Sequence, residues 1–282
     1  MSEPNTLLTG IAMGESPRWH DGRLWFADWG AGEIIATDLD GASDVMLRRQ
    51  SLPLSIDWLP DGRLLLVSGR DGLLLRVEHD GSVVTHAELN RLLEKPWNEI
   101  VVDGRGNTYV NTIGFDFPGG EFAPGRVALV TPDGSTRPVA DGLAFPNGMA
   151  ITPDNCTLIV AESYADQLTA FDIGDDGSLS NRRSWARVPG DHPDGICLDE
   201  DGAVWYGDVG SQHCVRVREG GEVLQRIDVD RGCFACMLGG TDGRTLFIVA
   251  NAWPLPADLT SESRRTGRVY SVDAPAARAG WP

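Results

Sequence analysis

The chain has 282 residues, 41% of them hydrophobic, so it is long enough to bury a substantial core. Its formal net charge of −17 argues against nucleic acid and anionic membrane surfaces as partners, because their phosphates would repel it. No run approaches the roughly 20 apolar residues of a membrane-spanning helix.

The N-terminal segment lacks the basic and apolar regions of a signal peptide, so we expect a cytoplasmic protein. Soon afterwards, residues Thr6–Ile11 form a short apolar stretch ahead of the first repeated unit. We expect this stretch to supply an outer strand to the last unit, because joining the two chain ends removes exposed sheet edges.

Six copies of one pattern then follow: an apolar strand, a tight turn, a second apolar strand and, in most copies, a third. The turns recur at intervals of 40 to 49 residues, at Asp21, Asp61, Arg105, Asp154, Asp201 and Asp242. A period of this length in an all-β sequence is typical of propeller blades. The prediction is therefore an all-β, six-bladed β-propeller, with residues 1–282 forming a single domain closed by the N-terminal strand.

Two segments fall outside the repeat. His86–Glu94 has apolar residues at helical spacing and predicts one or two helical turns between blades. The C-terminal segment 274–282 is rich in Ala, Pro and Gly and has no strand pattern, so we expect it to be loose.

The five cysteines include one C-x-x-C, Cys233–Cys236. A redox pair or half of a zinc site are alternatives, but no second C-x-x-C and no βαβ pattern accompanies it. We therefore expect structural, reduced cysteines.

In a propeller, the residues that begin the first strand of each blade meet near the central axis. About seven residues before each turn, the positions are Glu15, Ser55, Asn98, Asn147, Asp194 and Ala235. Carboxylates and an amide gathered at one axis would repel or stay unsatisfied without a cation between them. These are hard oxygen ligands, suited to Ca²⁺, Mg²⁺ or Mn²⁺, whereas zinc more usually recruits His or Cys.

Plainer interpretations exist for each of these motifs. Pro-Asn-Gly and Pro-Asp-Gly are common turn sequences. His192 lies two residues before Asp194 and is either a proton relay or a turn residue. Trp97 either walls a substrate pocket beside Asn98 or packs between blades. The long loops that carry Phe115, Phe117 and Trp253 would shape specificity.

Four motifs in order resemble the senescence marker protein (regucalcin)/gluconolactonase/luciferin-regenerating-enzyme family. They are Gly14–Trp19, Trp97–Asn98, Pro146–Met149 and Pro193–Ile196, and the resemblance runs from about residue 8 to about residue 273. It implies a six-bladed propeller with one divalent metal ion at the axis. Family members include sugar-lactone hydrolases, and related propellers hydrolyse organophosphates.

The resemblance also implies roles for individual residues. Glu15, Asn147 and Asp194 match the three metal ligands, and Asp194 also matches the proposed catalytic base. Asn98 matches a substrate-binding asparagine, and Asp116 falls where some members carry a substrate-binding Glu. Regucalcin-type members have an Arg two residues before that asparagine; here the position is Pro96. This difference argues against gluconolactone as the specific substrate.

The sequence therefore predicts a lactonase that uses one divalent ion, Ca²⁺ in the first place, to open a sugar lactone or similar cyclic ester. Such an ion would polarise the carbonyl and offset the charge of the oxyanion. Two alternatives stay open: a phosphotriesterase-like hydrolase on the same site, and a propeller that binds Ca²⁺ without turnover. The expected partner is a small-molecule substrate, and nothing in the sequence indicates an oligomeric state.

Overall fold

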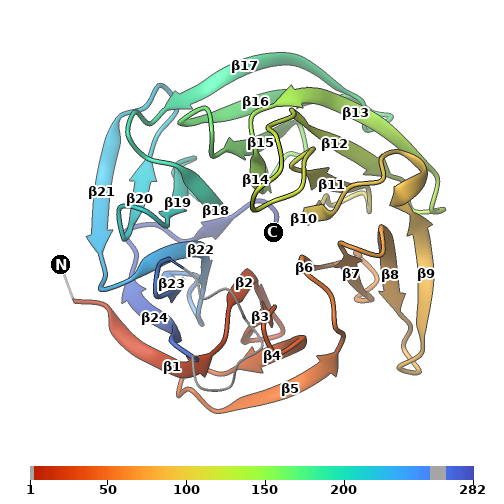
Figure 1. Ribbon diagram of the computed structural model, residues 1–282. Helices are drawn as coiled ribbons and strands as arrows, with labels where there is room; N and C mark the ends of the chain where they lie inside the picture. Colours follow the sequence, from red (N-terminus) through yellow and green to blue (C-terminus); the bar gives the residue numbers. More distant parts are fainter. Residues whose placement is uncertain (1–2, 255–264) are drawn as a thin grey trace.

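The computed structural model describes residues 3–254 and 265–282, and within them six small antiparallel sheets form a ring (Figure 1). Every sheet is a blade whose strands follow one another outward from the axis. The first three blades are β2 (Gly14–His20), β3 (Arg23–Asp28), β4 (Glu33–Thr37) and β5 (Ser43–Arg48); β6 (Leu54–Trp58), β7 (Leu64–Ser68), β8 (Leu73–Val77) and β9 (Val83–Glu88); and β10 (Trp97–Val102), β11 (Thr108–Thr112), β12 (Gly125–Val130) and β13 (Thr136–Leu143).

The second half of the ring repeats this order. Its blades are β14 (Pro146–Ile151), β15 (Thr157–Glu162), β16 (Gln167–Ile173) and β17 (Leu179–Arg187); β18 (Pro193–Asp199), β19 (Val204–Asp208), β20 (His213–Val217) and β21 (Val223–Asp228); and β22 (Gly232–Gly239), β23 (Thr245–Asn251), β24 (Gly267–Asp273) and the N-terminal β1 (Asn5–Ile11). The six-bladed propeller predicted from the repeat is confirmed.

The N-terminal strand closes the ring as predicted. Strand β1 pairs antiparallel with β24, from Asn5 opposite Ser271 to Ile11 opposite Gly267. The segment that leads into the first blade is thereby tied to the last blade by main-chain hydrogen bonds, which cover the outer edge of β24.

The prediction that residues 274–282 are loose is wrong, because this C-terminal segment pairs with inner strands. A short strand, β25 (Arg278–Ala279), pairs with the far end of the inner strand β18. Trp281 and Ile151 exchange two main-chain hydrogen bonds of 2.7 and 2.9 Å. The C-terminus accordingly lies inside the ring in Figure 1. This segment pairs with the edges of inner strands that are distant in the sequence. Its own composition therefore could not predict the pairing.

The predicted helical insert is smaller than expected. Strand β9 continues to Glu88, and only one 3₁₀ turn, η1 (Leu89–Arg91), follows it. Leu89 is buried in the core between the second and third blades, which ties this connection to the ring. No helix of the described residues is long and apolar enough to cross a membrane.

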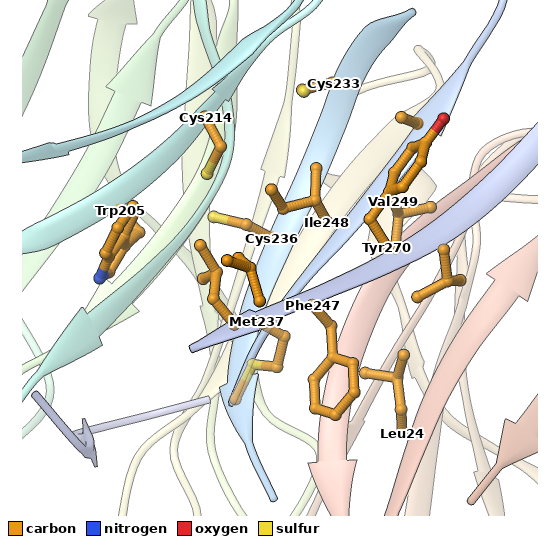
Figure 2. Close-up of a cluster of buried hydrophobic side chains, with 14 of the residues drawn as sticks. Leu24, Trp205, Cys214, Cys233, Cys236, Met237, Phe247, Ile248, Val249 and Tyr270 are labelled. Carbon is orange, nitrogen blue, oxygen red and sulfur yellow. The ribbon is translucent and has the colours of Figure 1, made fainter. Parts of the chain in front are cut away.

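The core lies between neighbouring blades, where the inner three strands present apolar side chains to one another. The largest buried cluster joins the fifth, sixth and first blades and includes Trp205, Phe247 and Leu24 (Figure 2). Four of the five cysteines, Cys197, Cys214, Cys233 and Cys236, pack in the same cluster. Burial raises the pKa of the Cys197, Cys214 and Cys236 thiols, which keeps them protonated and supports a packing role.

Candidate metal centre

The inner strands of the blades contact one another in sequence around the axis: β2, β6, β10, β14, β18 and β22. The predicted polar residues stand at or near the start of their strands, with Glu15 in β2, Asn98 in β10, Asn147 in β14 and Asp194 in β18. These starting ends share one mouth of the channel. The C-terminal segment lies at the other mouth, where β18 and β14 end.

A break in sheet register accompanies each of these four polar residues. The pairing of inner and second strand shifts between Glu15 and Arg18, Trp97 and Ile100, Pro146 and Met149, and Pro193 and Ile196. The second blade, whose residue at this position is Ser55, pairs without a shift. The sixth blade shifts as well, between Cys233 and Ala235, although Ala235 is apolar. A bulge turns a side chain away from the regular alternation of a strand, and four of these five bulges lie at a polar residue near the start of an inner strand.

The glycines after Asn147 and Asp194 explain the Pro-Asn-Gly and Pro-Asp-Gly motifs. A Cβ atom on Gly148 would lie 2.5 Å from the Asp194 carbonyl oxygen, and one on Gly195 would lie 2.4 Å from the Ala235 Cβ. Both glycines lie within strands rather than in turns. They allow inner strands of neighbouring blades to approach closely, which brings Asn147 and Asp194 near each other.

The amides of Asn98 and Asn147 are in direct contact. Asn98 Nδ2 lies 3.4 Å from Asn147 Oδ1, a long hydrogen bond. Asn111, buried at the end of β11, holds both strands: its Nδ2 donates to the Asn147 carbonyl at 2.6 Å, and its Oδ1 accepts from the Glu99 N–H at 3.2 Å. The sequence analysis missed Asn111, although an amide within the predicted strand around Thr108–Thr112 was an available signal.

The two carboxylates of the site, Glu15 and Asp194, are both buried. In the described part of the chain, no ion pair involves Glu15 or Asp194, and Asp194 Oδ1 has no hydrogen-bond partner. Burial raises the pKa of Glu15 well above its usual range, and the charges of Asp194 and Glu99 add to the effect. Burial likewise raises the pKa of Asp194, followed by the charges of Glu99 and Asp208. The donor set fits a divalent cation, because buried charges need a counter-ion and neither carboxylate forms an ion pair among the described residues.

A second acidic group, Glu99 and Asp57, lies deeper in the channel beside Arg18. Arg18 Nη2 lies 3.1 Å from Glu99 Oε1, and Arg18 Nε lies 3.8 Å from Asp57 Oδ1. Ser16 Oγ donates to the same Glu99 oxygen at 3.0 Å. Sequence reasoning did not identify these residues. Arg18 forms ion pairs with Glu99 and Asp57, whereas neither Glu15 nor Asp194 forms one among the described residues. The charge of Arg18 lowers the pKa of Glu15, but burial outweighs it.

The remaining predicted residues lie outside this centre. Trp97 is almost fully buried and packs in the core between the second and third blades, so it does not wall an open pocket; the packing alternative accounts for it. Asp116 is exposed in the loop between β11 and β12, where Lys95 Nζ lies 2.8 Å from its Oδ2. His192 pairs with Asp166 at 2.9 Å on the surface.

Asp191, Asp208 and His213 form another group whose ligand atoms lie within 4.8 Å of one another. Here, however, protein donors already occupy the carboxylates. Asp208 accepts the N–H groups of His192 and Ser211, both at 2.5 Å. Asp191 accepts Tyr206 Oη at 2.6 Å and lies 2.9 Å from His213 Nε2. Burial alone would raise the pKa of Asp191, but the bonds from His213 and Tyr206 outweigh it and lower this pKa.

Asp28 repeats the structural role of Asp208 in the first blade. It ends β3 as Asp208 ends β19, and it accepts the N–H groups of Ala12 and Met13, both at 2.9 Å. A carboxylate at this position therefore anchors the segment that enters the inner strand. Asp208 needs no cation to explain it, in contrast to Asp194.

Comparison with known proteins agrees with this architecture. The family described as SMP-30/Gluconolactonase/LRE-like region matches residues 13–252. Pentonolactonase XacC of Haloferax volcanii is 26% identical over 88% of this chain and 84% of its own, and diisopropyl-fluorophosphatase of Loligo vulgaris is 28% identical over 70% of each.

Two solved structures share the fold. A luciferin-regenerating enzyme has a TM-score of 0.82 at 20% identity and covers 98% of both chains. A calcium-binding protein, regucalcin of Agrobacterium tumefaciens, has a TM-score of 0.78 at 18% identity over 99% of this chain and 95% of its own. The lactonase relatives support a lactone-hydrolysing function.

Proposed function

Because this chain belongs to the SMP-30/gluconolactonase/LRE-like family, we propose that it is a lactonase that depends on one divalent metal ion, with Ca²⁺ as the first candidate. The observation that carries the proposal is the pair of buried carboxylates, Glu15 and Asp194, without a cationic partner in the described chain. Oxygen ligands of this kind suit Ca²⁺, Mg²⁺ and Mn²⁺ better than Zn²⁺.

Glu15, Asn147 and Asp194 would hold the ion. Bound there, it would polarise the carbonyl of a lactone and stabilise negative charge on its oxygen. Asn111 positions Asn147 for this role, because its Nδ2 donates a hydrogen bond of 2.6 Å to the Asn147 carbonyl oxygen. Ser163 positions the main chain next to Asp194, because its hydroxyl donates a hydrogen bond of 2.8 Å to the carbonyl of the preceding residue, Pro193.

Asp194 is also the proposed general base. Its Oδ1 makes no hydrogen bond among the described residues, so this oxygen would be left to accept the proton of an attacking water. A carboxylate that binds a cation is a weakened base, so its role as a ligand is expected to dominate. Asn98 donates towards Asn147 Oδ1 at 3.4 Å, a bond weak enough to exchange for a substrate oxygen. Asp116 would contact the substrate from the loop above.

The test is hydrolysis of a panel of aldonolactones and simple lactones by protein saturated with Ca²⁺ and by protein treated with EDTA. We expect turnover that EDTA abolishes and that added Ca²⁺ restores. Calcium binding without turnover of any lactone would leave a non-catalytic calcium-binding propeller.

A second candidate is a phosphotriesterase-like hydrolase on the same site. It is favoured by the similarity to diisopropyl-fluorophosphatase, which extends over 70% of both chains. A phosphoryl oxygen would take the place of the lactone carbonyl in the same pocket. Adding a fluorophosphate and a phosphotriester to the panel distinguishes the two activities by their kcat/KM.

A further inference from the structure

Five aromatic side chains form one cluster beside the candidate metal centre, and we call it the aromatic wall: Phe115, Phe117, Phe122, Phe145 and Tyr164. Phe115 is its buried hub. Its ring centroid lies 5.7 Å from that of Phe122, 5.8 Å from Phe145, 6.2 Å from Tyr164 and 6.3 Å from Phe117. The closest pair, Phe145 and Tyr164, is separated by 4.6 Å. These distances are typical of packed aromatic pairs.

Strand pairing places the wall at the mouth that carries Asn98 and Asn147. Thr112, which ends β11, pairs with Trp97 at the start of β10, and Glu162 pairs with Pro146 at the start of β14. The loop 113–124 and Tyr164 leave from these ends. In Figure 1 the connection between β11 and β12 runs close to the inner strands β10 and β14. A Cβ atom on Gly125, where the loop ends, would lie 2.4 Å from Pro146 Cδ, next to Asn147.

Main-chain contacts hold the wall in place. Phe145, two residues before Asn147, has a φ of 57°, which a bulky side chain rarely adopts. Its carbonyl accepts the Ser163 N–H at 3.1 Å, and the Ala144 carbonyl accepts the Tyr164 N–H at 3.1 Å. Such conformations persist where the surroundings enforce them, and they concentrate at binding sites.

The loop 113–124 is equally compact. Gly114 has a φ of +90°, and a Cβ atom there would lie 2.2 Å from the Pro124 carbonyl oxygen. The Gly120 N–H donates to the Asp116 carbonyl at 2.7 Å. The loop therefore presents its aromatic rings from a folded support rather than from an open turn.

Three of the five rings are left about half exposed: Phe117 at 50%, Phe122 at 53% and Tyr164 at 53%. The exposed aliphatic side chains Val45, Met46, Val83, Val84 and Val223 lie instead on the outer strands β5, β9 and β21. Scattered exposed aliphatic residues need no explanation, whereas clustered aromatic rings at the edge of a polar site do.

We propose that the aromatic wall binds an apolar substituent, an alkyl chain or an aryl ring, carried by the lactone or ester whose carbonyl lies at Glu15, Asn147 and Asp194. This inference rests on the proposed function and narrows its substrate class from polyhydroxylated sugar lactones to lactones with an apolar side group. Phe145 lies two residues before Asn147, so the wall adjoins the polar site directly. One small molecule could therefore contact both at once, which is why we propose a small-molecule occupant. Pro96, two residues before Asn98, fits the same class, since it adds no hydrogen-bond donor for a sugar hydroxyl.

The test compares δ-valerolactone, δ-decalactone and glucono-δ-lactone as substrates of the Ca²⁺-saturated protein. For the wild type we expect kcat/KM for δ-decalactone to exceed that for δ-valerolactone by about tenfold or more, the range that apolar contacts in a pocket supply. In the double variant Phe117→Ser/Phe122→Ser this ratio is expected to fall about tenfold. Val223→Ser, which removes an equally exposed apolar side chain from β21, is the matched control and should leave the ratio unchanged.

Two outcomes would overturn the inference: a preference for glucono-δ-lactone in the wild type, or an unchanged ratio in the double variant. Sedimentation that shows self-association of the wild type but not of the double variant, with equal kinetics, would assign the wall to a second copy instead. If no lactone is hydrolysed, the proposed function fails separately. Calorimetry with δ-valerolactam and its 6-phenyl derivative then decides: tighter binding of the phenyl compound that the double variant loses supports the wall, and equal binding refutes it.

Discussion

Two groups of acidic side chains lie near the same mouth of the propeller, and they differ in what surrounds them. Asp191 and Asp208 receive hydrogen bonds from Tyr206, His192 and Ser211. Glu15 and Asp194 are buried as deeply, yet they have no ion pair among the described residues. The carboxylates of the first group accept their hydrogen bonds from donors within the protein and so anchor the fifth blade. The second leaves oxygens that a cation would satisfy, which is the physical difference between an anchoring acid and a metal ligand.

The largest effect is expected from Asp194→Asn. This change keeps the volume of the side chain but removes one of two charges that would hold a cation, so calcium affinity and lactone kcat/KM should each fall about a hundredfold or more. Isothermal titration calorimetry and steady-state kinetics measure the two quantities. Wild-type affinity in the variant would remove Asp194 from the metal site.

The next effect is a pH dependence of stabilisation by calcium. Because the folded-state pKa values of Glu15 and Asp194 are raised, the folded metal-free protein binds more protons than the unfolded chain above about pH 4, and its stability falls as pH rises towards those pKa values. Asp57, whose pKa burial raises to about 6, contributes with the same sign between about pH 4 and pH 6.

Protons and calcium therefore compete at Glu15 and Asp194. At a hundredfold excess over Kd, calcium should raise Tm by roughly 5 °C at pH 7.5. The increase should be clearly smaller at pH 5, where more of the carboxyl groups carry a proton. Thermal unfolding with calcium and with EDTA at both pH values measures this difference, and an equal increase at the two pH values would contradict it.

Asn111→Ala tests the support beneath the site. The change leaves the Asn147 carbonyl and the Glu99 N–H without their buried partner, which should lower the free energy of unfolding by about 1–3 kcal/mol. Calcium affinity should fall about tenfold, because Asn147 is no longer fixed. Denaturant unfolding and calorimetry give both values; a loss of stability with unchanged affinity would reduce Asn111 to a purely structural residue.

The smallest effect on the metal site is expected from Asp208→Asn, the counterpart of Asp194→Asn. Replacing one acceptor oxygen by an amide nitrogen disturbs the bond to His192 or to Ser211 and should destabilise the fold by about 1–3 kcal/mol. Calcium affinity should stay within about threefold of wild type. A collapse of affinity would show that the group around Asp208, not the axis, binds the ion.

The repeat predicted the fold because the physical signal is local: apolar strands and turns recur with every blade. The polar residues that begin inner strands were predictable for the same reason, since Glu15, Asn147 and Asp194 occupy corresponding positions. The site's supports were not predictable in this way. Asn111 and Ser163 act through hydrogen bonds to other strands, and such bonds do not recur from blade to blade in the sequence.

The C-terminal segment and Trp97 show the same limit. Residues around Trp281 pair with an inner-strand edge far away in sequence, so a composition typical of loose tails was misleading. Trp97 adjoins Asn98, but neighbouring residues in a strand point to opposite sides, and its indole enters the core. Which side faces the mouth becomes clear only once the blades are assembled.

The most direct test of the account is anomalous diffraction from crystals grown with Mn²⁺ or Ca²⁺. We predict one strong peak at the channel mouth, with oxygens of Glu15, Asn147 and Asp194 at about 2.1–2.6 Å. A peak between Asp191, Asp208 and His213, with none at the axis, would contradict the assignment of the metal centre.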